Sequence, residues 1–215
     1  MERDWILQQA EAFVRQELAG DSSGHDVWHI ERVRRMAEVI AREEGADVFV
    51  CQLAALLHDI PDEKLNDSPE AGMKKLTNWL DEHPLDADIR AHLLDIITTM
   101  SFKGGNQPPV RTLEGRIVQD ADRLDAIGAL GIARTFAYSG AKGQLSYDPD
   151  LPPRTDLTAQ DYRKGKSTAV NHFHEKLFLL KDLMNTESAK RIAAERHRYM
   201  EEFLKRFHEE WAGQM

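Results

Sequence analysis

Apolar side chains recur along this chain at intervals of three and four residues, the spacing that places them on one face of an α-helix. Five such stripes lie within the following segments: Ile30–Ile40, Val50–Leu57, Ile89–Met100, Phe173–Met184 and Met200–Phe207. No stretch alternates apolar and polar residues with the period of a β-strand. The spacing therefore predicts an all-α fold, in which each helix buries one face in a common core.

Residues with capping preferences support several of these helix boundaries. Ser68-Pro69-Glu70 combines an N-cap residue, a proline at the first helical position and an early acid, which predicts a helix start. Gly20 and Gly45 are predicted to end the first two helices. Thr158 and Asp161 resemble a capping pair, although Asp replaces the usual Glu or Gln.

The 215 residues suit one domain over residues 1–215, with a core at about 20–130 and a C-terminal helical extension at about 158–215. Two loops rich in glycine and proline interrupt the helical pattern, at Lys103–Pro109 and Ser139–Thr155. Loops of this kind either bind ligands or are plain surface excursions, and the sequence leaves both readings open. The late helices could also support a homodimer.

The net charge and the number of cysteines restrict the possible binding partners and the cellular compartment of the protein. The formal net charge of −9 argues against a nucleic-acid-binding protein, because phosphate contacts need clustered cations. A small phosphorylated substrate stays compatible, since a metal ion and a few local cations can offset the acidic field. The single cysteine, Cys51, permits no internal disulfide, and Leu53–Leu57 is too short to span a membrane. We expect a cytoplasmic protein without a membrane partner.

Four candidate metal ligands lie on three of the predicted helices: His29, the pair His58-Asp59, and Asp122. The pair follows an apolar run directly, and Asp122 stands between apolar residues of its helix. Burial of an unpaired carboxylate costs several kcal/mol, so a shared cation would stabilise all of these groups together.

The ligand set of two imidazoles and two carboxylates suits Mn, Fe, Co, Ni or Zn better than Mg. An octahedral ion with four protein ligands keeps two positions for water and a phosphoryl oxygen. Such an ion lowers the pKa of water and polarises the phosphorus centre. The set therefore predicts a metal-dependent phosphohydrolase.

The three segments His29-Ile30-Glu31-Arg32-Val33, Leu56-Leu57-His58-Asp59 and Ala121-Asp122-Arg123-Leu124 carry a family resemblance. In this order, over roughly residues 25–125, they resemble the HD-domain metal-dependent phosphohydrolases. The resemblance implies a helical bundle with a divalent metal ion held by the four candidate ligands.

A closer likeness extends over Gly24–His29, Ile117–Ala126 and Val170–Thr186. These segments resemble the YpgQ/YedJ-like subgroup of small bacterial HD-domain hydrolases. This resemblance implies an enzyme that favours manganese, with Mg, Co, Ni or Fe as other candidates, and that cleaves nucleoside triphosphates to monophosphate and pyrophosphate.

Other readings of the same site stay open. One is a phosphatase acting on nucleoside monophosphates or other phosphomonoesters, and another is a non-catalytic HD module that senses nucleotides. Hydrolases of guanosine tetraphosphate resemble the chain less, because they carry Glu-Asp where this chain has Asp62-Glu63.

Six further residues are candidates for roles beyond the metal. Asp62 occupies the position, three residues after Asp59, where related enzymes carry an acid that serves as a base, and Glu63 is the neighbouring alternative. The candidates for contacts with a phosphorylated substrate are Lys103, Arg123, His25 and Lys166.

Overall fold

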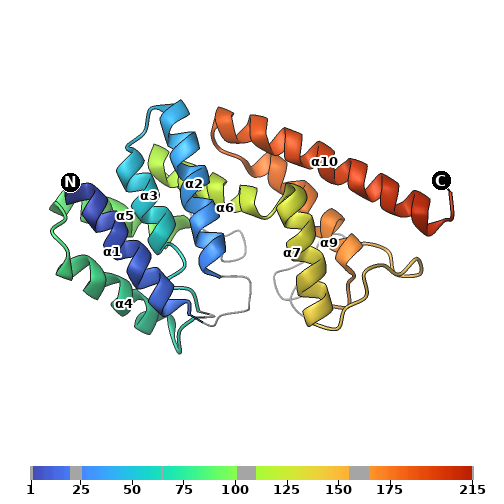
Figure 1. The fold of residues 1–215 in the computed structure, drawn as a ribbon, viewed down its shortest axis with the longest axis horizontal. Coiled ribbons are helices and arrows are strands. Elements are labelled where there is room, and N and C mark those ends of the chain that lie inside the picture. The colour runs from blue at the N-terminus through green and yellow to red at the C-terminus, as the bar shows by residue number, and fades with distance from the viewer. Residues whose placement is uncertain (1, 20–25, 64, 101–109, 155–164, 215) are drawn as a thin grey trace. The chain divides into compact units, whose positions relative to one another are not determined.

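The structure, a computed structural model, describes residues 2–19, 26–63, 65–100, 110–154 and 165–214. These residues form helices and connecting turns and contain no β-strand, which confirms the predicted all-α class (Figure 1). The chain divides into two compact units, Met1–Asp122 and Arg123–Met215, each described by itself below. No helix in the described part of the chain is long and apolar enough to cross a membrane.

The first unit is built around one fully buried helix. It contains α1 (Glu2–Glu17), α2 (Val27–Glu44), α3 (Val48–Leu57), α4 (Pro69–Glu82), α5 (Ala87–Met100) and most of α6 (Leu113–Asp125). Helix α3 contacts α1, α2 and α5, and all its residues from Phe49 to Leu57 are buried. The sequence predicted one buried face for α3. The structure buries every side, because helices surround it.

Side-chain and glycine caps fix the helix ends of this unit where the sequence predicted them. The Ser68 hydroxyl accepts the N–H of Ala71 at 3.1 Å, and Pro69 occupies the first turn of α4. Gly45 ends α2 with a left-handed φ of 73°, a conformation that glycine adopts without steric cost. The predicted caps at Gly20 and at Thr158 with Asp161 lie outside the described residues.

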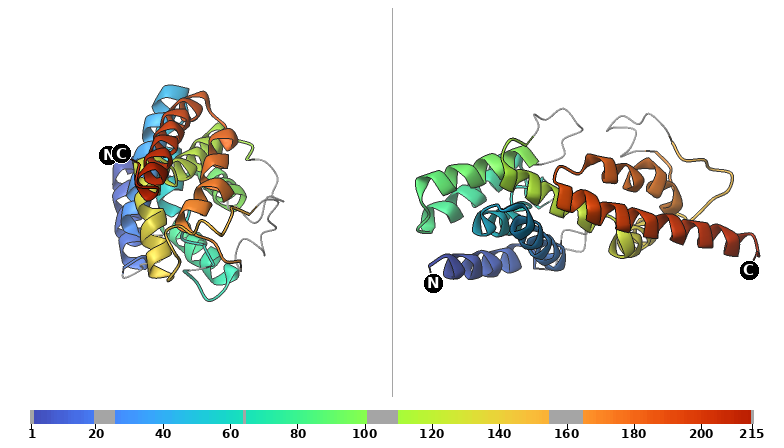
Figure 2. Two further views of the ribbon diagram at one scale, coloured as in Figure 1. Left: turned by 90° about the vertical axis from the view of Figure 1, so that its right-hand side faces the viewer. Right: turned by 90° about the horizontal axis from the view of Figure 1, so that it is seen from above.

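The second unit contains α7 (Gly128–Ala141), α9 (Ala169–Glu175), the 3₁₀ helix η1 (Leu177–Leu183) and α10 (Glu187–Trp211), which are yellow to red in Figures 1 and 2. The sequence predicted one helix over 173–184. The structure ends α9 at Glu175, and Lys176 leaves the helical region with φ −143°. The three-residue turn of a 3₁₀ helix still places Leu177 and Leu180 on one side, and both are buried.

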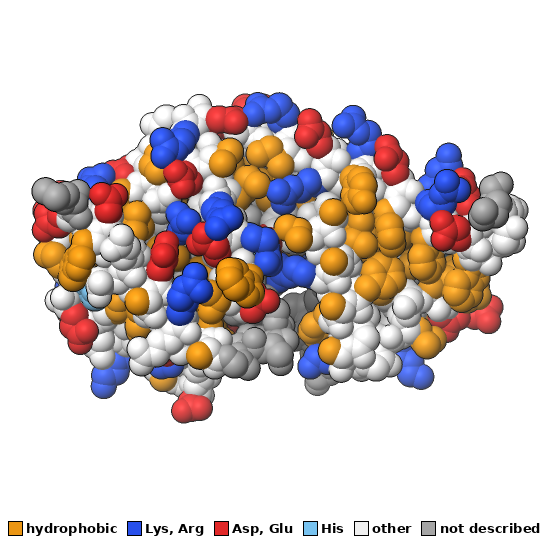
Figure 3. Space-filling view, viewed as in Figure 1, with side chains coloured by type: hydrophobic (Ala, Val, Ile, Leu, Met, Phe, Trp, Pro, Cys, Tyr) orange, Lys and Arg blue, Asp and Glu red, His pale blue; other side chains and the backbone are white. Residues whose placement is uncertain are grey.

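Aromatic rings hold the second unit together. Phe136 of α7 lies 6.2 Å from Phe173 of α9 and 5.9 Å from Phe203 of α10, measured between ring centroids. Hydrophobic side chains also gather on the visible face of this unit (Figure 3). The exposed hydrophobic residues of the second unit include Leu130 on α7 and Tyr199 on α10.

Candidate metal centre

The first turn of α2 carries His29, and a side-chain cap fixes that turn. Asp26 has an extended backbone (φ −72°, ψ 161°), and its carboxylate accepts the N–H of His29 at 2.7 Å. The cap satisfies one of the free N–H groups at the helix start. Its negative charge also interacts favourably with the positive end of the helix dipole. His29 itself is buried on the core side of α2.

The pair His58 and Asp59 lies at the end of α3, in the turn that leads away from the core. His58 is the C-cap residue with helical backbone angles, and the N–H of Asp62 donates to the Asp59 carbonyl at 2.9 Å. The Nδ1 atom of His58 lies 2.8 Å from the carbonyl oxygen of Ala55. Nδ1 therefore carries the proton in neutral His58, which directs the lone pair of Nε2 into the site.

Three buried side chains collect their ligand atoms in one place. One ligand atom from each of His29, His58 and Asp59 lies within 4.8 Å of the others. Nε2 of His29 is 3.6 Å from Oδ2 of Asp59, and Nε2 of His58 is 3.2 Å from Oδ1 of Asp59. Asp122 of α6 adds a fourth group, because its Oδ1 lies 3.5 Å from Nε2 of His29.

The electrostatics of His58 fit a cation at this position. Burial lowers the pKa of His58, but the carboxylates of Asp59 and Asp122 outweigh it and raise the pKa overall. Nε2 of His58 is buried and has no hydrogen-bond partner in the part of the chain that the structure describes. A buried polar atom without a hydrogen bond is costly, and a divalent cation between these imidazoles and carboxylates would satisfy it.

Asp122 is less buried than its apolar neighbours in the sequence predict. Asp122 was expected to be a buried carboxylate, but 42% of its side chain is exposed. The buried acids of α6 are Asp120 and Asp125, and Asp125 forms an ion pair with Arg134. Asp122 points to another side of the helix because each residue turns the direction by about 100°. Its role as a ligand stays a prediction, which the 3.5 Å approach to His29 supports.

The other predicted site residues differ in where they lie. Asp62 is partly buried, and its charge contributes to the raised pKa of His58, whereas Glu63 is exposed. Arg123 donates to the main-chain carbonyl of Leu183 within the second unit.

Lys166 is an exposed residue of the second unit. His25 and Lys103 lie outside the described residues. The roles of these residues in substrate binding stay predictions.

Sequence reasoning missed Asp26, whose cap orients the backbone of His29. The available signal was an Asp directly before an apolar-periodic helix, which is the usual position of an N-cap. The carbonyl of Ala55 was also missed, because residue types do not reveal which main-chain oxygen faces an imidazole.

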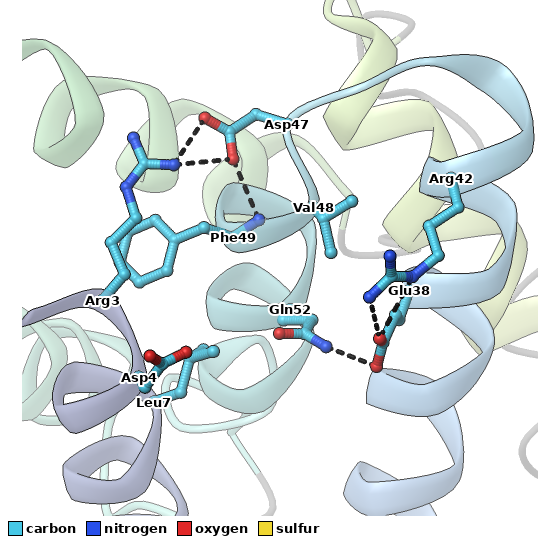
Figure 4. A pocket seen from close by; sticks show the side chains of 9 residues that line it. All are labelled: Arg3, Asp4, Leu7, Glu38, Arg42, Asp47, Val48, Phe49 and Gln52. Carbon is cyan, nitrogen blue, oxygen red and sulfur yellow. Dashed lines mark hydrogen bonds and ion pairs between the residues drawn. The ribbon is translucent and has the colours of Figure 1, made fainter. Parts of the chain in front are cut away.

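A cavity of about 470 Å³ lies at the other end of the α2–α3 pair, lined by Arg3, Asp4, Leu7, Glu38, Arg42, Asp47, Val48, Phe49 and Gln52 (Figure 4). Nine residues separate His29 from Glu38, which corresponds to about 14 Å along the helix. Two ion pairs lie within this cavity: Arg3 contacts Asp47 at 3.3 Å, and Arg42 contacts Glu38 at 2.7 Å. The cavity is therefore distinct from the metal centre.

Comparison with known proteins agrees with the fold. The HD domain family model matches residues 27–127, which include all four candidate ligands. YpgQ of Bacillus subtilis (strain 168) is 38% identical over 212 residues, covering 96% of each chain. The chain therefore belongs to the HD-domain family, in the group that includes YpgQ.

Solved structures of HD-superfamily proteins are also similar to this chain. An HD-superfamily hydrolase from Bacillus thuringiensis is 48% identical, with a TM-score of 0.81 over 99% of this chain and 100% of that chain. The structure of Bacillus subtilis YpgQ in complex with ADP is 35% identical, with a TM-score of 0.79 over 98% and 97%. Membership of this group assigns the chain to the metal-dependent phosphohydrolases.

Proposed function

We propose that the protein is a nucleoside triphosphate pyrophosphohydrolase that releases monophosphate and pyrophosphate. The observation that carries the proposal is the buried group of His29, His58 and Asp59, with one ligand atom of each within 4.8 Å of the others. The nucleotide comes from similarity, since the related YpgQ was crystallised with ADP. The product class rests on the resemblance to the same subgroup.

The four residues His29, His58, Asp59 and Asp122 would hold the ion, and we propose manganese as the preferred one. A divalent cation supplies Lewis acidity for a phosphoryl group and lowers the pKa of water. The hydrogen bond from His58 to Ala55 fixes the imidazole, which leaves Nε2 as the atom that would bind the ion. The half-exposed carboxylate of Asp122 marks the side of the site that solvent and substrate can reach.

Asp62 is the proposed proton acceptor. It follows Asp59 by three residues, and the hydrogen bond from its N–H to the Asp59 carbonyl keeps it beside the site. Water adds to the α-phosphorus, the bond from that phosphorus to the bridging oxygen breaks, and pyrophosphate leaves. Asp62 takes the proton of the attacking water.

The experiment removes metal from the purified protein with a chelator and then adds Mn, Mg, Co or Ni with each of the common nucleotides. Phosphate and pyrophosphate are measured separately, and the Asp59→Asn variant serves as the matched inactive form. We expect metal-dependent release of pyrophosphate from triphosphates. Release of phosphate from monophosphates would indicate a phosphatase instead. Nucleotide binding without any turnover would indicate a sensing module.

A further inference from the structure

An exposed tryptophan directly precedes a candidate metal ligand in the sequence. Trp28 directly precedes His29 in the first turn of α2, and 62% of its surface is exposed. The guanidinium carbon of Arg15 on α1 lies 5.7 Å from the centroid of its ring. Because Arg15 covers one face of the indole, the exposed surface lies mainly on the other face and the edges. Tryptophan is usually well buried, so such exposure needs a reason.

The other exposed tryptophans contact aromatic rings, whereas the ring of Trp28 contacts a cation. Trp5 packs on His83 with 5.7 Å between centroids, and Trp211 packs on Tyr147 at 5.1 Å. The contact of Trp28 with a cation leaves its ring ready for a further planar partner. A cation on one face of an aromatic ring also holds the ring in one orientation.

Trp28 and the candidate ligand His29 belong to the same first turn of α2. Side chains of an α-helix lean toward its N-terminus, and the candidate ligand of α2 lies at that end. Consecutive residues are turned by about 100°, so the indole of Trp28 and the imidazole of His29 leave the first turn of α2 in different directions. A molecule with phosphates at the centre and a ring at some distance from them matches this arrangement.

We propose that Trp28 is the stacking platform for the base of the nucleotide, with Arg15 fixing the orientation of the indole. This inference rests on the proposed function, because it requires the phosphates to lie at the metal centre. Every base has a π face, so a stacking platform selects nucleotides over phosphate compounds without a base and discriminates little among bases. Fixing the ring before binding lowers the entropy cost of capturing the base.

The kinetic test compares Trp28→Ala, Trp28→Phe and the control Trp5→Ala with Mn present. The substrates are several nucleoside triphosphates and inorganic tripolyphosphate, which has no base. We expect Trp28→Ala to raise KM for every nucleotide on the order of tenfold, with kcat and the KM for tripolyphosphate little changed. Trp28→Phe is expected to restore most of the nucleotide affinity, and Trp5→Ala to behave like the wild type.

A binding test separates this inference from the proposed reaction. The fluorescence difference between the wild type and Trp28→Phe reports on Trp28, and ADP is expected to quench it more strongly than tripolyphosphate does. Quenching by ADP in a protein that hydrolyses no nucleotide would support the stacking and contradict the proposed hydrolysis. An unchanged nucleotide KM in Trp28→Ala, or an equal loss with tripolyphosphate, would overturn the stacking role.

Discussion

The two units bury polar groups for different purposes. In the first unit, the buried His29, His58 and Asp59 turn toward one another, and Nε2 of His58 finds no hydrogen bond in the described part of the chain. In the second unit, the buried carboxylate of Glu175 accepts hydrogen bonds from Arg154 and Ser167. A buried polar atom without a hydrogen bond, such as Nε2 of His58, indicates a position for a ligand, whereas a buried carboxylate that accepts several hydrogen bonds, such as that of Glu175, indicates a structural role.

The largest expected effect comes from a comparison of the buried His58 with the partly buried His172. His58→Gln removes the candidate ligand atom Nε2, and a metal contribution of several kcal/mol corresponds to a loss of activity of about a thousandfold. The matched variant is His172→Gln in the second unit, where burial lowers the pKa of His172 to about 4. We expect His172→Gln to keep the bound metal and most of the activity.

Metal content after dialysis and the rate of pyrophosphate release measure both variants, and circular dichroism verifies that each is folded. If His58→Gln kept the metal and the rate of the wild type, the assignment of the centre would be wrong. If His172→Gln lost both in a folded protein, the site would need a contribution from the second unit.

The second prediction concerns the hydrogen-bonded cluster of Arg154, Ser167 and Glu175. Arg154 donates to Glu175 from Nε at 2.9 Å, from Nη2 at 2.8 Å and from its main-chain N–H at 3.1 Å, and Ser167 donates at 3.0 Å. Only 1% of the Glu175 side chain is exposed. Loss of the charge of a buried pair destabilises strongly, so Glu175→Gln is expected to lower the free energy of unfolding by about 2 kcal/mol.

The matched control for this change is Glu187→Gln, since Glu187 is 84% exposed and contacts Lys190 at 2.7 Å. A surface pair contributes about 0.5 kcal/mol or less, so the control should unfold at nearly the urea concentration of the wild type. Equal effects of the two substitutions would contradict the structural role of Glu175. The metal content of Glu175→Gln should equal that of the wild type.

The pH dependence of the same cluster gives a smaller effect. Burial raises the pKa of Glu175, but the hydrogen bonds from Arg154 and Ser167 outweigh it and lower the pKa below the ordinary value of 4.5. A carboxyl whose pKa is lowered by folding stabilises the protein above 4.5, and this contribution is lost as the pH falls through the folded pKa. The stability difference between the wild type and Glu175→Gln should therefore stay constant from neutral pH to about pH 5 and shrink below it.

Urea unfolding of both proteins at a series of pH values measures this difference and cancels the titration of the other acids. A difference that grew on acidification would show that the folded pKa is raised, contrary to the hydrogen bonds of Glu175.

The sequence predicted the first unit better than the second, for physical reasons. The pair His58-Asp59 follows an apolar helix directly, so local order along the chain already places both groups at the edge of the core. The burial of Asp122 was predicted wrongly, because the burial of α6 depends on which of its faces other helices cover. The cluster of Arg154 and Glu175 joins residues far apart in the sequence, and no local spacing indicates such a pair.

The smallest effect concerns the cap of α2, which links local structure to the metal centre. Asp26→Ala removes the 2.7 Å hydrogen bond to the N–H of His29 and should cost about 1 kcal/mol of stability. Ser68→Ala removes the corresponding cap of α4, at 3.1 Å from the N–H of Ala71, and should cost a similar amount.

Only the first of these two helices carries a metal ligand in its first turn. Groups that orient a ligand typically contribute 10- to 100-fold to metal affinity, so Asp26→Ala should weaken Mn binding by roughly tenfold and Ser68→Ala should leave it unchanged. Calorimetric titration of the metal-free proteins with Mn measures the two affinities, and thermal unfolding measures the two stabilities. If the two variants are equally stable but Asp26→Ala binds Mn more weakly, Asp26 orients His29 for metal binding. If both variants bind Mn with equal affinity, Asp26 is only a helix cap.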